Sequence, residues 1–60
     1  MEIPKDDFIL LSLVNTKLRN DYSSFEELCD EEGILSSEIN GRLFGLGYVY
    51  DEKLNAFVRE

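Results

Sequence analysis

The apolar residues recur at helical spacing through most of the chain, and the spacing becomes strand-like only near the end. In the first segment Leu10, Val14 and Leu18 fall on one side of a helix, with Leu11 beside them. Near the end, two β-prone runs flank a polar stretch, which is typical of a hairpin. The pattern predicts helices over residues 6–20, 24–32 and 36–46 and a β-hairpin over residues 48–58.

Residues suited to helix ends lie at the boundaries of these segments. Asp6 is expected to be the N-cap of the first helix, because its carboxylate can accept hydrogen bonds from the free backbone N–H groups of the first turn. Ser24 and Glu27 form the S-x-x-E capping box of the second helix. Gly33 is expected to end that helix, since glycine adopts the left-handed backbone conformation without steric cost. By the same reasoning, Gly47 is expected to cap the third helix directly after its last residue.

The second and third helices have the spacing of a helix-turn-helix. Cys29 is the small residue that lets the helices cross closely, Gly33 forms the turn, and apolar residues follow at Ile34 and Ile39. The hairpin then occupies the position of a wing. We therefore expect a single, mainly helical domain over residues 1–60, with a three-helix, helix-turn-helix and winged-helix-like fold and a C-terminal β-hairpin.

Two residues of the first helix, Ile9 and Leu13, fall outside its core-facing stripe. They are four residues apart and lie about 100° from the middle of the stripe. In one interpretation the C-terminal segment folds over them within the chain. In the other they form an exposed apolar strip that binds a second copy of the chain or a partner helix. Ile9 and Leu13 are thus the candidate interaction surface, with both interpretations open.

The composition describes one small acidic domain. The chain has 60 residues, and its 6 basic and 13 acidic residues give a net charge of −7. A domain of this size has a small margin of stability, so its seven aromatic residues are expected to contribute to the core, and dimerisation would add buried surface. The negative charge repels nucleic acid and anionic membranes, and it favours solubility or basic partners.

DNA binding is the alternative function that a helix-turn-helix suggests. The third helix would begin at Leu35 or Ser36, and Ser37, Asn40 and Arg42 would contact base edges or phosphates. Specific DNA binding relies on several Lys or Arg contacts to phosphates. Here the preceding helix is strongly acidic instead. Nucleic acid is therefore an unfavoured partner.

No set of residues in the chain forms a catalytic or metal-binding constellation. There is no histidine, the commonest general base and metal ligand. Cys29 is the only cysteine, so it has no second thiol to pair with, and its apolar neighbours predict a buried thiol. The consecutive acids of residues 30–32 point in different directions on a helix and lack the pattern of a calcium loop. We expect no enzyme activity, no cofactor and no metal site.

The sequence also lacks the pattern of a membrane or secreted protein. It begins with the polar and acidic residues MEIPKDD, which do not resemble a signal peptide. The longest apolar run, residues 8–11, is too short to span a bilayer. We therefore expect a cytoplasmic protein that does not bind membranes.

Short motifs over nearly the whole chain carry a resemblance to a known family. They are Leu10-Leu11-Ser12, Val14-Asn15, Leu18-Arg19, Tyr22-Ser23-Ser24, Glu27-Leu28-Cys29, Tyr50-Asp51 and Leu54-Asn55. The chain resembles a family of very short bacterial proteins that is catalogued as a domain of unknown function. The resemblance implies a small cytoplasmic bacterial protein, and it transfers no activity or site. The expected function is a non-enzymatic protein-interaction or homodimerising module.

Overall fold

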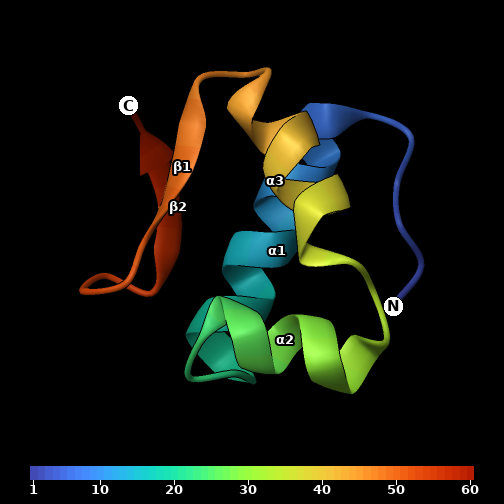
Figure 1. The fold of residues 1–60 in the computed structure, drawn as a ribbon, viewed down its shortest axis with the longest axis vertical. Coiled ribbons are helices and arrows are strands. Elements are labelled where there is room, and N and C mark those ends of the chain that lie inside the picture. The colour runs from blue at the N-terminus through green and yellow to red at the C-terminus, as the bar shows by residue number, and fades with distance from the viewer.

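The longest helix lies at the centre of the fold, and the other elements pack around it. The computed structural model describes all residues from 1 to 60. In Figure 1 the central helix runs from top to bottom, one helix lies in front of its upper half, another crosses its lower end, and the hairpin stands to one side. The elements are α1 (Asp7–Asn20), α2 (Phe25–Glu32), α3 (Ser36–Phe44), β1 (Tyr48–Asp51) and β2 (Ala56–Arg59). The predicted architecture of three helices and a C-terminal hairpin is confirmed.

The predicted caps of the first two helices are present. The Asp6 carboxylate accepts hydrogen bonds from two backbone N–H groups of the first turn of α1, at 2.8 and 3.1 Å. The Ser24 hydroxyl accepts from the Glu27 N–H at 3.0 Å, while the Glu27 carboxylate accepts from the N–H of Ser23, one residue before the cap. Gly33 ends α2 with a left-handed backbone, φ +67°. Each of these helix ends is set by groups only a few residues apart, so it could be predicted from the residues at the boundary.

The third helix is shorter than predicted. It ends at Phe44, so the expectation that it continues to residue 46 is wrong. Gly45 is its C-cap, because glycine weakens the helix there and the chain tightens into two i→i+3 turns. Gly47 has the left-handed backbone expected of a terminating glycine, φ +87°, but it acts in the turn that leads into the hairpin.

The core is a single cluster of nine buried residues contributed by all three helices and the hairpin. The predicted α1 stripe is fully buried, with Leu11 partly buried at its edge. The hairpin contributes Phe57, whose ring meets that of Phe25 edge to face at a centroid distance of 4.9 Å. Two of the seven aromatic residues, Phe8 and Phe44, are exposed, so the expectation that all of them serve the core is wrong. The buried residues are Leu10, Val14, Leu18, Phe25, Leu28, Cys29, Ile39, Leu43 and Phe57.

The antiparallel hairpin is attached to α1 by a side-chain amide. The strands pair with Tyr50 opposite Phe57, and both rings contact the core. The amide of Asn15 bonds to both backbone groups of Phe57: its Nδ2 donates to the carbonyl at 3.0 Å, and its Oδ1 accepts from the N–H at 2.8 Å. Asn15 therefore binds the β2 backbone as a neighbouring strand would.

A second amide, that of Asn55 in the hairpin turn, joins the hairpin to the end of α1. Its Nδ2 donates to the carbonyls of Leu18 at 3.0 Å and Tyr22 at 2.9 Å, and its Oδ1 accepts from the Tyr50 hydroxyl at 2.7 Å. The last carbonyls of a helix have no partner within it. Asn55 thus supplies a C-terminal cap to α1 from a residue far along the chain. It does so with a left-handed backbone, φ +50°.

A charged cluster joins the end of α2 to the first residues of the chain. The amino group of Met1 lies 2.6 Å from one oxygen of the Glu32 carboxylate. The other oxygen accepts a hydrogen bond from the Tyr22 hydroxyl and lies 3.5 Å from the Lys17 ammonium. The hydrogen bond from the amino group, followed by that from Tyr22, lowers the pKa of Glu32 from 4.5 to about 2. The same carboxylate raises the pKa of Tyr22 to about 12.

We predict that replacing Asn55 destabilises the protein by two separable effects. Asn55→Gly keeps the left-handed backbone and removes the hydrogen bonds, which should lower the free energy of unfolding by about 1–3 kcal/mol. Asn55→Ala also strains the backbone and should cost about 1 kcal/mol more. Urea denaturation of both variants measures the two terms. A glycine variant as stable as the wild type would show that these bonds contribute nothing.

We also predict an acid-sensitive contribution from Glu32. Because its pKa is lower in the folded protein than the usual 4.5, its contribution is complete above pH 4.5 and is lost as the pH falls towards 2. Glu32→Gln should therefore be less stable than the wild type at neutral pH and should approach it near pH 2. The measurement is urea denaturation across this range, with exposed Glu31→Gln as the control. A difference that does not change with pH would contradict the prediction.

Candidate interaction surface

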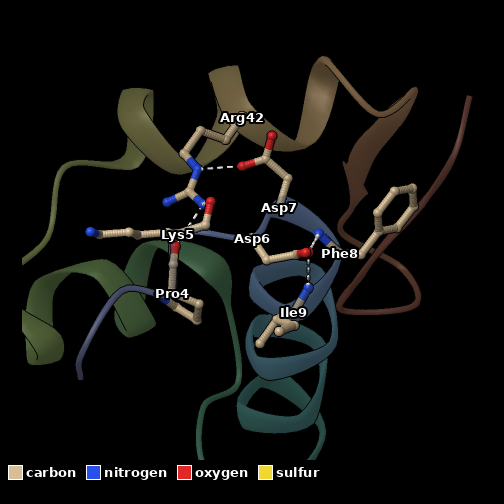
Figure 2. A network of polar contacts seen from close by, with 7 residues as sticks. All are labelled: Pro4, Lys5, Asp6, Asp7, Phe8, Ile9 and Arg42. Atoms are coloured by element: carbon tan, nitrogen blue, oxygen red, sulfur yellow. Dashed lines mark hydrogen bonds and ion pairs between the residues drawn. The ribbon is translucent and has the colours of Figure 1, made fainter.

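The outward face of α1 is an exposed apolar strip. Phe8 and Ile9 are 66% and 58% exposed, and Leu13 is partly buried beside them. Ser12 and Thr16 complete the lining of a shallow hollow on this face. Figure 2 shows Phe8 and Ile9 projecting from the first turn of α1. We call these five residues the α1 face.

The hairpin leaves this face open. It contacts α1 through Asn15, whose bonds to Phe57 place the strands against a different side of the helix from Ile9. One interpretation was that the C-terminal segment covers Ile9 and Leu13. In the structure it does not cover Ile9. Phe8 is a part of this face that the apolar spacing alone did not single out. Its angle on the helix, about 120° from the middle of the buried α1 stripe, could have indicated that it faces away from the core.

The α1 face carries no charged side chain, although the chain as a whole has a net charge of −7. Charges stand only at its two ends. Asp6 precedes the helix and Arg19 lies in its last turn; both are exposed, and neither forms an ion pair within the chain. The face can therefore meet another apolar surface without bringing like charges together.

The residues predicted to contact DNA are separated by the structure into two environments. Ser37 and Asn40 are exposed on α3, whereas Arg42 is partly buried. Figure 2 shows the Arg42 side chain turned towards the segment before α1. Its Nε lies 2.6 Å from an Asp7 carboxylate oxygen, and one terminal nitrogen donates to the carbonyls of Pro4 at 2.6 Å and Lys5 at 3.0 Å.

Arg42 therefore holds the N-terminal segment against α3. Its charge is paired with Asp7, and α3 contains no other Lys or Arg. The helix consequently exposes Ser36, Ser37, Asn40 and the acidic Glu38, and it presents no unpaired cation to a phosphate backbone. The spacing of the sequence identified Arg42 as polar and helical, but it could not reveal a partner 35 residues away.

Cys29, the only cysteine of the chain, lies in the core. It is buried on α2, and burial, followed by the charge of Asp30, raises the pKa of its thiol. A thiol with a raised pKa is a poor nucleophile at neutral pH. The prediction of a buried cysteine is confirmed.

We predict that Arg42→Ala releases the N-terminal segment. The variant loses an ion pair and two hydrogen bonds to backbone carbonyls, so the free energy of unfolding should fall by about 1–3 kcal/mol. Hydrogen exchange should rise in residues 1–6 more than in the rest of the protein. Arg59→Ala removes an exposed arginine that forms no ion pair, at the end of β2, and is the control. Unchanged exchange in residues 1–6 would show that other contacts hold this segment.

None of the helices of the chain combines the length and apolarity needed to cross a membrane.

Comparison with known proteins places the chain in a family. No curated protein and no solved structure matches the chain. The family described as Domain of unknown function (DUF4250) matches residues 4–57. Because that match covers most of the 60 residues, the chain belongs to this family of domains of unknown function.

Proposed function

We propose that the protein is a non-enzymatic interaction module that forms a homodimer through the α1 face. The observation that carries the proposal is the exposure of Phe8 and Ile9 on a continuous, uncharged side of the central helix. Removal of apolar side chains from water is the dominant favourable term in most protein association. A domain of 60 residues also gains stability from any apolar area that a partner buries.

The charges at the ends of α1 favour a second copy of the chain as the partner. In a symmetric dimer each copy presents the same surface to the other. If two α1 helices cross antiparallel between Ser12 and Leu13, Asp6 of one copy lies opposite Arg19 of the other, because both are equally far along the helix from that midpoint. The pairing repeats on both sides of the dimer axis. It also aligns the two helix dipoles favourably.

The size of the face indicates a weak, reversible dimer. A stable interface buries about 800 Å² on each partner. The whole protein exposes 4060 Å², so such an interface would cover about a fifth of its surface. One helical face of 14 residues is smaller than this. We therefore expect association with a dissociation constant on the order of micromolar, governed by concentration.

We predict that Ile9→Glu abolishes the dimer and leaves the monomer folded. Ile9 is exposed, so a carboxylate there costs the fold little, whereas in the dimer the carboxylate would be buried without a partner against Thr16 of the other copy. Sedimentation velocity over a concentration series should show the wild type approaching twice the monomer mass. The variant should remain monomeric at every concentration. Circular dichroism verifies its fold.

Further variants separate this surface from general apolar association. Leu54→Glu introduces the same charge at a leucine that is 66% exposed in the hairpin turn, and it should leave the dimer intact. Leu13→Glu should abolish the dimer as Ile9→Glu does, and Arg19→Glu should weaken it by removing the end pairs. A wild type that stays monomeric at millimolar concentration would overturn the proposal. Salt-sensitive binding of duplex DNA by that monomer would instead support the alternative function, DNA binding through Ser37 and Asn40 of α3.

A further inference from the structure

A second hollow, apart from the α1 face, lies where α2, the start of α3 and the hairpin meet. It has a volume of about 520 Å³. Its floor is apolar and its rim carries three carboxylates, with no Lys or Arg among its lining residues. We call it the α2–α3 groove. The apolar side consists chiefly of Phe25, Ile34 and Leu35, and the acidic side of Glu26, Asp30 and Glu52.

Leu35 is poorly suited to its position at the start of α3. It is the N-cap of α3, its side chain caps nothing, and it is 70% exposed, the most exposed large apolar residue of the chain. A serine at this position would complete an S-x-x-E capping box, because Glu38 already stands at the third helical position. An exposed leucine in place of a cap stabilises neither the helix nor the core. Local conflicts of this kind are expected at functional positions.

The carboxylates around Leu35 define the charge of an occupant. Glu26 and Asp30 are four residues apart on α2 and so lie on the same side of that helix. Glu52 adds a third carboxylate from the hairpin turn, and none of the three forms an ion pair within the chain. A second copy of this acidic chain would be repelled, whereas a cationic segment would be attracted.

We propose that the α2–α3 groove binds a basic, amphipathic segment of another protein. An apolar side chain of that segment packs on Leu35 and Ile34. Lysine or arginine side chains on its flanks pair with Glu26 and Asp30 on one side and with Glu52 on the other. The site is independent of the α1 face, so a dimer would carry two such grooves.

Synthetic peptides test the two halves of this recognition. The probe is a fluorescein-labelled peptide with leucines on one helical face and lysines on the other. Its matched partner carries serines in place of the leucines at the same charge. Fluorescence anisotropy should show that the leucine peptide binds at least tenfold more tightly, because only it fills the apolar floor. Equal binding of the two peptides would overturn the proposal, since charge alone would then account for it.

Leu35→Ser is the decisive variant, because stability and binding should change in opposite directions. The new cap should raise the melting temperature, while loss of the apolar contact should weaken the leucine peptide about tenfold. Leu54→Ser removes an equally exposed leucine outside the groove and should leave the affinity unchanged. If Leu35→Ser binds as tightly as the wild type, the groove is not the binding site.

The acidic rim is tested by a pair of variants with the same change in charge. Glu26→Gln with Asp30→Asn should weaken the peptide several-fold at low salt, and Glu31→Gln with Glu60→Gln should weaken it much less. Equal losses in both would contradict a defined rim. The Ile9→Glu monomer should retain full peptide affinity, so failure of the dimer and failure of the groove are seen separately.

Discussion

Two asparagine amides, those of Asn15 and Asn55, hold the hairpin against the central helix, and the rest of the fold depends on that attachment. A two-stranded hairpin is not stable alone in water. Here its β2 backbone bonds to Asn15, and its turn bonds to the end of α1 through Asn55. Only in this position does Phe57 enter the core and meet Phe25. The amides therefore convert two strands and a helix into one packed unit.

The local features of the fold could be predicted, because their causes lie within a few residues. Asp6, Ser24 and Gly33 act on backbone groups at most four positions away, and the α1 stripe reflects helical geometry. The amide contacts of Asn15 could not be predicted in this way. They join residues 42 positions apart, and a polar residue on a helix reads as solvent-exposed until its partner is known. The end of α3 was missed because two glycines compete to terminate it.

The α1 face and the α2–α3 groove differ in how well their residues could be predicted from the sequence. Ile9 was identifiable because its angle on the helix wheel departs from the buried stripe. Phe8 departs from the stripe as well, but it was missed because an aromatic residue in a small domain is ordinarily assigned to the core. Leu35 is a different case. Its significance depends on the helix beginning at the residue after it, a boundary that the sequence left between two positions.

The cap that Asn55 provides links the end of α1 to a residue near the other end of the chain. The carbonyls of Leu18 and Tyr22 gain their partner only after the hairpin has closed. Docking of β1 and β2 therefore adds a partner to a helix end that is otherwise closed only by the backbone N–H groups of Asp21 and Tyr22, both donating to the Lys17 carbonyl. Helix and hairpin should then unfold in one cooperative transition, without a populated helical intermediate. In so small a protein, the stability of a helix end depends in part on a turn that lies 37 residues further along the chain.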